Sequence, residues 1–351
     1  MSRYRRPELG AAFGYTPGEQ PQDSGGWLKL NSNESPLPPS SRVAAAVAEA
    51  AADLTRYPDP NAEPLRSALA RHHDVASEQV FVANGADQVL DCCYRAFASP
   101  GDPVVRTEPS YSLLPVLATL FSAKDVAVPL DAGGALSADF GTRTAVLRIV
   151  VNPNSPTGHW IEPEVLEARL GAASGIVAID EAYCDFAPAS CIPLLAAHPT
   201  WLVIRTLSKS HALAGLRVGY AVGNREVIAD LNSVKDSYPV DRCAIAGAEA
   251  ALADGDHHAL IIATVRRERA RITDVLSDLG WLVEPSEANF VFARPPRGMA
   301  ASEVADRLRG ERILVRHFTS PGLDDRLRIS IGDSAATDRL LGAIARIGDA
   351  R

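Results

Sequence analysis

Short apolar runs rich in Val, Ile and Leu alternate with helical patterns between about residues 80 and 235. The helical patterns include Asp87–Phe97, Pro163–Leu170 and Arg225–Lys235, and Pro163 is suited to a first helical position. Strands that alternate with helices are typical of an α/β unit with a mostly parallel, buried sheet. The predicted strands are Val80–Ala83, Pro103–Arg106, Val126–Leu130, Ala145–Val151, Ile176–Ile179, Leu202–Arg205 and Val218–Val222.

The pattern changes after about residue 254, which predicts a second and smaller α+β domain. A long Arg-rich helix is expected over about Ala259–Leu279. Shorter elements are expected within Trp281–Arg294, Ala301–Arg309, Ile313–Val315 and Arg326–Ile331. Residues 1–40 are rich in Pro, Gly, Ser and Asn and predict an irregular arm that joins the small domain. We therefore expect an arm over 1–40, a large domain over 41–254 and a small domain over 255–351.

Composition narrows the class of protein. The 351 residues are 46% hydrophobic and 22% charged, as in ordinary soluble globular proteins. A net charge of −8 argues against a nucleic-acid partner, and no apolar run is long enough to span a membrane. The five cysteines show no metal-ligand spacing, so we expect no metal and a reduced, cytoplasmic protein.

Polar residues follow the carboxyl ends of several predicted strands, where α/β sheets bind ligands. Leu202–Arg205 leads into a segment with a lysine and an arginine, and Ile176–Ile179 ends in an Asp-x-x-Tyr sequence. The residues so placed are Gly85, Ala86, Asp87, Tyr111, Asn154, Ser155, Asp180, Tyr183, Thr206, Ser208, Lys209 and Arg217. We expect these side chains to form one site.

The motifs resemble those of the fold-type I pyridoxal-phosphate (PLP) enzymes, and most closely those of the histidinol-phosphate aminotransferase family. They are LNSNESP at Leu30–Pro36, RYPD at Arg56–Asp59, NPNSPTG at Asn152–Gly158 and LSK with GLR over Leu207–Arg217. The resemblance covers roughly residues 5–348. It implies a large αβα domain with a mostly parallel seven-stranded sheet, a smaller α+β domain and PLP as the cofactor.

The resemblance assigns the central cofactor contacts. PLP chemistry needs an amine that forms an imine and then moves a proton. Among Lys29, Lys124, Lys209 and Lys235, only Lys209 lies just past a buried strand among small hydroxyl residues. Asp180 would keep the pyridine nitrogen protonated, and Tyr183 would hydrogen-bond the phenolate of the cofactor.

Further cofactor contacts follow from the same resemblance. Thr206, Ser208, Arg217 and the helix start at Gly85-Ala86-Asp87 would bind the phosphate, because the start of a helix favours an anion. Tyr111 would stack on the ring, and Tyr57 would reach the phosphate in a neighbouring subunit, which implies a homodimer. Many relatives carry Asn where this chain has Ser155, so either Asn154 or a water replaces that contact, or Tyr183 alone holds the phenolate.

The substrate contacts are expected from two arginines and a tyrosine. Arg328 matches the carboxylate-binding arginine of the family, and Arg316 matches one used on the substrate phosphate. Tyr15 of the arm would close over the phosphate. Asn289 matches a family signature with no assigned role. The implied reaction is transamination between a small-molecule amino donor, histidinol phosphate, and the 2-oxo acid 2-oxoglutarate.

Other functions remain open at this stage. A threonine-phosphate-type PLP decarboxylase would share the arm and both arginines, and an aromatic or specialised biosynthetic aminotransferase could differ in pocket residues alone. A PLP-binding regulator is disfavoured, because the chain has no room for a DNA-binding domain before residue 30 and has an acidic balance. A dehydrogenase is also disfavoured, because no G-x-G-x-x-G follows a first strand.

Overall fold

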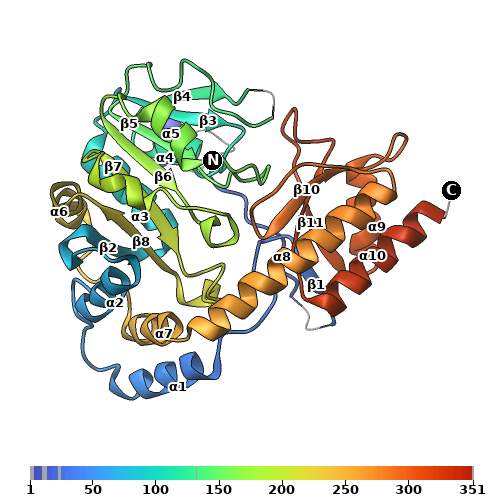
Figure 1. Cartoon of the computed structure of the whole chain (residues 1–351), viewed down its shortest axis with the longest axis horizontal. Helices are drawn as coiled ribbons and strands as arrows, with labels where there is room; N and C mark the ends of the chain where they lie inside the picture. Colours follow the sequence, from blue (N-terminus) through green and yellow to red (C-terminus); the bar gives the residue numbers. More distant parts are fainter. Residues whose placement is uncertain (1–3, 10–13, 23–24, 132, 350–351) are drawn as a thin grey trace.

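A computed structural model describes residues 4–9, 14–22, 25–131 and 133–349, which form two sheets with helices packed on them (Figure 1). The larger sheet has seven strands in the order β2-β8-β7-β6-β5-β3-β4. Its neighbours are parallel except for β8, which is antiparallel to both β2 and β7. The strands are β2 (Val80–Asn84), β3 (Pro103–Glu108), β4 (Lys124–Pro129), β5 (Leu147–Val151), β6 (Ile176–Asp180), β7 (Trp201–Thr206) and β8 (Val218–Gly223). The predicted α/β fold with a mostly parallel seven-stranded sheet is confirmed.

The larger sheet is buried on both faces, as the alternation along β7 demonstrates. Val203 packs in one core cluster with α2 (Glu63–His73), α5 (Pro163–Leu170) and α7 (Arg242–Leu252). Leu202 and Ile204 pack in a second cluster. The helices of that second cluster are α3 (Gly85–Phe97), α4 (Leu114–Leu120) and α6 (Arg225–Val234). The central strands are continuously apolar because both faces of the sheet are covered there, whereas the edge strand β4 is mostly exposed.

The smaller sheet has five strands in the order β1-β11-β12-β10-β9. They are β1 (Leu28–Leu30), β9 (Leu282–Val283), β10 (Phe290–Arg294), β11 (Ile313–His317) and β12 (Leu327–Ser330). The helices that pack with it are α8 (Gly255–Asp278), α9 (Ala301–Gly310) and α10 (Ser334–Asp349). Helix α1 (Ser41–Ala50) packs on α7. Short 3₁₀ helices are η1 (Pro7–Leu9), η2 (Ala51–Asp53), η3 (Ser77–Gln79), η4 (Cys184–Phe186), η5 (Ile192–Ala196) and η6 (Ala214–Leu216).

The N-terminal arm takes part in the smaller sheet, because β1 pairs in parallel with β11. Residues 1–3, 10–13, 23 and 24 of the predicted arm lie outside the described residues. The boundaries at residues 40 and 254 stay predictions. One core cluster includes Tyr183 and Phe186, which follow β6, together with residues of the smaller sheet and of α8. The carboxyl end of β6 therefore lies against the smaller sheet.

Strand direction places the functional motifs at one edge of the larger sheet. β3, β5, β6 and β7 are parallel, and β2 runs with them because both it and β7 are antiparallel to β8. The carboxyl ends of these strands face the smaller sheet and the arm (Figure 1). Among the described residues, no helix has the length and apolar character needed to cross a membrane.

Candidate active site

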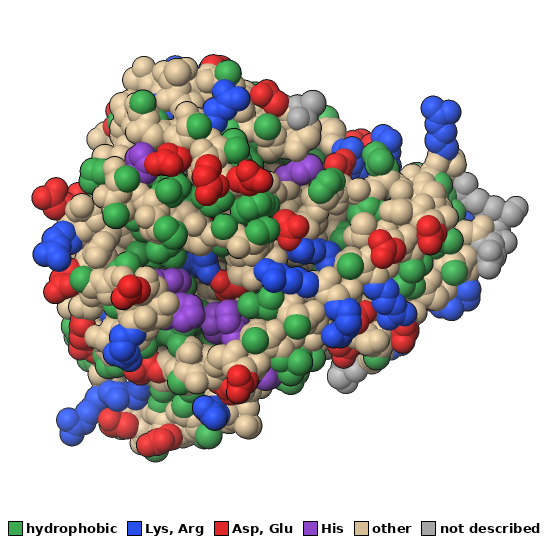
Figure 2. All heavy atoms as spheres, in the orientation of Figure 1, with side chains coloured by type: hydrophobic (Ala, Val, Ile, Leu, Met, Phe, Trp, Pro, Cys, Tyr) green, Lys and Arg blue, Asp and Glu red, His purple; other side chains and the backbone are tan. Residues whose placement is uncertain are grey.

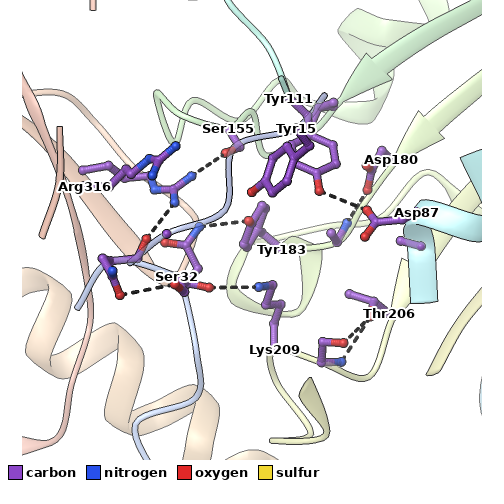
Figure 3. A pocket seen from close by; sticks show the side chains of 18 of the residues that line it. Tyr15, Ser32, Asp87, Tyr111, Ser155, Asp180, Tyr183, Thr206, Lys209 and Arg316 are labelled. Carbon is purple, nitrogen blue, oxygen red and sulfur yellow. Dashed lines mark hydrogen bonds between the residues drawn. The ribbon is translucent and has the colours of Figure 1, made fainter. Parts of the chain in front are cut away.

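A cavity of about 230 Å³ lies where the carboxyl ends of the larger sheet meet the arm and the smaller sheet (Figure 3). Thirteen of the residues singled out in the sequence line it: Tyr15, Ala86, Asp87, Tyr111, Ser155, Asp180, Tyr183, Thr206, Ser208, Lys209, Arg217, Arg316 and Arg328. Gly85, Asn154 and Tyr57 are not among the lining residues. Residues that the sequence placed at the ends of β2, β3, β5, β6 and β7 thus meet residues of β11, β12 and the arm in one cavity, and the role of each residue stays a prediction.

Lys209 stands in the loop after β7 and points its amine into the cavity (Figure 3). Its Nζ lies 3.5 Å from the Ser32 carbonyl and 5.7 Å from the centre of the Tyr183 ring. It forms no ion pair with any described residue. Burial, with the nearby positive charge of Arg328, lowers the pKa of Lys209 from 10.5 to about 8. About a tenth of this amine is therefore unprotonated and nucleophilic at pH 7, far more than for a lysine with the ordinary pKa.

Asp180 is the last residue of β6 and is almost fully buried. Its Oδ1 accepts a hydrogen bond of 3.0 Å from the Ala182 amide. Burial raises the pKa of Asp180 from 3.8 to about 7, and the negative charges of Asp87 and Glu181 act in the same direction. No described residue forms a salt bridge with this carboxyl, so it is suited to a cation or protonated ring nitrogen supplied by a ligand.

Tyr183 is held by a residue of the arm that the sequence analysis did not assign. Its hydroxyl accepts a hydrogen bond of 2.9 Å from Asn33 Nδ2. The hydroxyl of Ser330 on β12 holds Asn33 in place. It accepts a hydrogen bond of 2.8 Å from the Asn33 backbone amide and donates one of 3.1 Å to Asn33 Oδ1. Asn289 donates to the Asn33 carbonyl at 3.0 Å, which gives the unassigned Asn289 a structural role. The LNSNESP motif was the available signal for Asn33.

The start of α3 and the loops around β8 form the other end of the cavity. Arg217 Nη2 lies 3.2 Å from Asp87 Oδ2, and the Tyr111 hydroxyl donates to Asp87 Oδ1 at 3.0 Å. A Cβ on Gly219 would lie 2.2 Å from the Ala86 nitrogen, and one on Gly85 would lie 2.5 Å from Arg217 Nη2. The two glycines therefore let the start of α3 approach β8 and the guanidinium. Free N–H groups at a helix start beside an arginine suit an anion.

Hydroxyl groups complete this end of the cavity. Thr206 Oγ1 donates to the Val218 carbonyl at 3.0 Å and lies 3.0 Å from Ser208 Oγ. The Ser208 amide donates to Thr206 Oγ1 at 3.1 Å. Arg217 itself adopts a left-handed backbone with φ of 53°, an uncommon conformation for a residue with a side chain. This backbone conformation positions the side chain of Arg217, which carries the guanidinium.

Asn154 supports a loop instead of facing the cavity. Its amide donates to the Pro109 carbonyl at 3.1 Å and to Thr157 Oγ1 at 2.9 Å. Both amide hydrogens are therefore engaged within the protein, whereas Oδ1 is buried without a hydrogen-bond partner among the described residues, and the expected cofactor contact of Asn154 stays a prediction. Ser155 does line the cavity, and its Oγ accepts a hydrogen bond of 3.1 Å from Arg328.

Arg316 on β11 and Arg328 on β12 are opposite each other in the antiparallel register. Arg328 donates to Ser155 Oγ and, at 3.2 Å, to the Asn31 carbonyl. Arg316 donates to the carbonyls of Thr16 and Pro17 in the arm, at 2.8 and 3.1 Å. Neither arginine forms an ion pair with a described residue. Two cations without a carboxylate partner in one cavity are suited to anionic substrate groups.

The aromatic residues fall into two groups. Tyr15 and Tyr111 meet edge to face across the cavity, with ring centres 5.8 Å apart. Tyr57 lies outside the cavity, is 78% exposed and stacks on Tyr238 with ring centres 4.5 Å apart. Within one chain Tyr57 does not line the cavity that contains Lys209, so its predicted role depends on a second subunit.

Comparison with known proteins identifies the family. The model of the family "Aminotransferase class I and II" matches residues 25–344. Histidinol-phosphate aminotransferase 1 of Bradyrhizobium diazoefficiens is 43% identical over 351 residues, covering 99% of this chain and 100% of that protein. Histidinol-phosphate aminotransferase 2 of Thiobacillus denitrificans is 44% identical, covering 98% of this chain and 97% of that protein.

Solved structures agree with the fold. The histidinol-phosphate aminotransferase of Sinorhizobium meliloti, determined with pyridoxal-5'-phosphate, superposes with a TM-score of 0.85 at 29% identity and covers 92% of this chain and 91% of that one. The L-threonine-O-3-phosphate decarboxylase of Porphyromonas gingivalis has a TM-score of 0.80 at 21% identity, covers 92% of this chain and 99% of that one, and shows a shared fold alone. With its cavity, its motifs and its full-length relatives in agreement, the chain belongs to the class I and II aminotransferase family.

Proposed function

We propose that this protein is a PLP-dependent aminotransferase that exchanges an amino group between histidinol phosphate and 2-oxoglutarate, giving imidazole-acetol phosphate and glutamate. One observation carries the proposal: a partly buried amine, a buried carboxyl and two arginines share one cavity, and neither the amine nor the arginines form an ion pair with a described residue. The relatives named for this reaction, at 43% and 44% identity over nearly their full length, support the choice of substrate.

The residues fit PLP group by group. Lys209 offers an amine without an ion-pair partner among the described residues, and Asp180 offers a buried carboxyl for a ring nitrogen. Arg217 and the start of α3 offer donors for a phosphate, and Gly85 and Gly219 keep side chains from filling the approach to these groups. When bound, PLP supplies an aldehyde that accepts the amino group and a ring that withdraws electrons from the substrate Cα.

The protein's own groups then have distinct tasks. Lys209 Nζ, with its pKa near 8, takes a proton from the substrate Cα and returns one during the exchange. Asp180 keeps the ring nitrogen protonated by placing a carboxylate beside it. Tyr183, fixed by Asn33, holds its hydroxyl at the cavity wall as a donor for an anionic oxygen. Tyr111 and Tyr15 cover the cavity with apolar rings that exclude water.

The two arginines would select the substrates. The planar fork of Arg328 suits the α-carboxylate of glutamate, and its two aromatic neighbours, Phe290 and Phe318, hold the guanidinium at ring distances of 5.4 and 5.5 Å. Arg316 suits the phosphate of histidinol phosphate. Because Arg316 also binds the carbonyls of Thr16 and Pro17, the arm is placed to bring Tyr15 over that phosphate.

The proposal is tested by mixing the purified holoenzyme with L-histidinol phosphate and recording the visible spectrum. We expect loss of the internal cofactor absorbance, and recovery of it when 2-oxoglutarate is added. If histidinol phosphate leaves the spectrum unchanged while glutamate converts it, the aminotransferase assignment stands and the substrate is wrong. Release of carbon dioxide from a phosphorylated amino acid without a 2-oxo product would instead identify a decarboxylase.

We also infer a homodimer in which Tyr57 contacts the phosphate of the cofactor in the other subunit, and a cytoplasmic location. Exposure of the Tyr57–Tyr238 stack supports the first inference, and five cysteines without a disulfide among the described residues support the second. Mixing subunits tests the shared site. A hybrid of Lys209→Ala and Tyr57→Ala chains should regain activity, because one of its two sites is intact. Equal inactivity of hybrid and parents, despite confirmed mixing, would contradict the shared site.

A further inference from the structure

A cluster of side chains that can act as metal ligands lies next to the loop that carries Lys209. It contains Asp185 of η4, His211 and His258 of α8, whose ligand atoms all lie within 4.8 Å of one another. His211 follows Lys209 by two residues, whereas His258 belongs to the long helix that leads to the smaller sheet. Figure 2 shows histidine side chains gathered around a hollow in this face of the molecule. The three residues are far apart in sequence, so their spacing gave no metal-ligand pattern.

His258 faces the carboxylate of Asp185 without a normal hydrogen bond. The distance between His258 Nε2 and Asp185 Oδ2 is 3.4 Å. The Nε2 atom is buried, and no described residue hydrogen-bonds it. A ring nitrogen lone pair directed at a carboxylate oxygen is repulsive unless a proton or a metal ion lies between them. This pair therefore offers two ligand atoms to a cation.

His211 is held in the form that binds metals. Ser210 Oγ donates to Asp185 Oδ2 and lies 3.0 Å from His211 Nδ1. Because the serine proton points to the carboxylate, Nδ1–H donates to Ser210 Oγ, which leaves the lone pair on Nε2 of His211. A hydrogen bond on the other ring nitrogen is how proteins orient a metal-binding histidine.

The local charge also favours a cation. The Arg205 guanidinium pairs with both Glu181 and Asp185. One cation against two carboxylates leaves one negative charge. A cavity of about 10 Å³ lies beside the two histidines of the cluster: His211 and His258 line it, and Asp185 does not. That space is close to the size needed for a single water molecule, which a bound metal requires as its remaining ligand.

We propose that Asp185, His211 and His258 bind a zinc ion, with water as the fourth ligand. Imidazole and carboxylate ligands suit Zn²⁺, and tetrahedral Zn–N and Zn–O bonds of about 2.0–2.1 Å place ligand atoms roughly 3.4 Å apart. The rings of His211 and His258 are stacked, with centres 4.0 Å and planes 18° apart, so binding one ion requires both rings to rotate out of the stack until their nitrogen lone pairs converge. The bound ion fastens α8 to the loop that carries Lys209.

The test is calorimetric titration of the tag-free, EDTA-treated holoenzyme with zinc chloride. We expect one ion per chain, and affinity at least about 100-fold lower in His258→Gln and in His211→Gln, because loss of a ligand costs more than the 10- to 100-fold loss typical of an outer-shell partner. The matched control is His198→Gln, because His198 also sits against a carboxylate, 2.8 Å from Glu167, but outside the cluster. Circular dichroism checks that each variant is folded.

A second measurement keeps the proposal independent of variant folding. Cobalt(II) added to the wild-type protein should give the visible absorption bands of a tetrahedral site, and zinc should abolish them. The proposal is overturned if the wild-type protein binds no zinc, if His211→Gln and His258→Gln bind it as well as wild type, or if His198→Gln loses binding to the same extent.

Discussion

The buried carboxyl of Asp180 should lower the free energy of unfolding of the cofactor-free protein. Replacing it with the isosteric amide should restore that free energy. In Asp180→Asn the Ala182 amide keeps an acceptor, because an amide oxygen can replace Oδ1. The amide cannot ionise, so the variant removes the free energy that the folded protein spends on a buried charge. The opposite result is expected for catalysis, where the same variant should slow turnover by about 10²- to 10⁴-fold, because a ring nitrogen beside a neutral amide does not stay protonated.

The size of the stability effect follows from the pKa of Asp180. The carboxyl has a pKa of 3.8 in the unfolded chain and about 7 in the folded protein. Below pH 3.8 the group is neutral in both states and destabilises neither. As the pH rises from 3.8 through 7, the unfolded state gains stability by ionising first. At about 1.36 kcal/mol per pKa unit, the loss reaches up to about 4 kcal/mol at pH 8 and is less than about 2 kcal/mol at pH 5.

The measurement is urea unfolding of cofactor-free wild-type and Asp180→Asn proteins at pH 5, 6, 7 and 8. We expect the variant to be more stable, by an amount that grows with pH and levels off near pH 8. Asp125→Asn is the control, because its carboxylate pairs with Arg106 outside the cavity and does not act on Asp180, so its removal should not stabilise the protein. A variant less stable than wild type at every pH, or a difference independent of pH, would refute the reasoning.

Three further predictions concern the cavity. Lys209→Ala should lower turnover more than about 10³-fold while PLP still binds weakly, as read from turnover and from cofactor absorbance after gel filtration. Gly219→Ala should weaken PLP binding about tenfold or more, because its Cβ would lie 2.2 Å from the Ala86 nitrogen. A Cβ at Gly215 meets no atom within 4 Å, so Gly215→Ala should leave PLP binding unchanged. Fluorescence titration of the cofactor-free proteins with PLP compares the two variants. Arg316→Lys should raise KM for histidinol phosphate about tenfold and leave KM for glutamate unchanged in steady-state assays, because lysine keeps the charge but loses the fork; an equal effect on both would contradict a phosphate role.

The larger sheet could be predicted from the sequence because its strands are buried on both faces. All seven predicted strands are present, and most limits differ by one or two residues. Edge strand β4 (Lys124–Pro129) begins two residues before its apolar run, because pairing with β3 holds the polar Lys124 and Asp125 in the sheet. Helix α5 was predicted with its observed bounds, since Pro163 marks its start and the apolar Leu166 and Leu170 lie on its buried face.

The contacts of the arm could not be predicted, because they depend on pairing across the whole chain. Strand β1 joins β11, more than 280 residues away, and a three-residue strand has no distinctive periodicity. Asn33 reaches Tyr183 only because Ser330 and Asn289 hold its backbone. The motif around Asn33 gave its position in the sequence but not its partner. The turn of Asn154 away from the cavity likewise depends on Pro109, which the sequence did not connect with it.

The cavity as a whole carries an excess of positive charge that the fold alone does not compensate. Its lining contains Lys209, Arg217, Arg316 and Arg328 against the carboxyls of Asp87 and Asp180. Because the pKa of Asp180 is raised by burial, that group offers at most a partial negative charge near pH 7. An anionic cofactor and an anionic substrate would therefore stabilise the folded protein by supplying the missing charges. Because PLP binds the folded protein, the free energy of unfolding must rise as PLP is added, by about 2.7 kcal/mol at a hundredfold excess over its Kd. The same electrostatics that destabilise the cofactor-free protein therefore favour PLP binding.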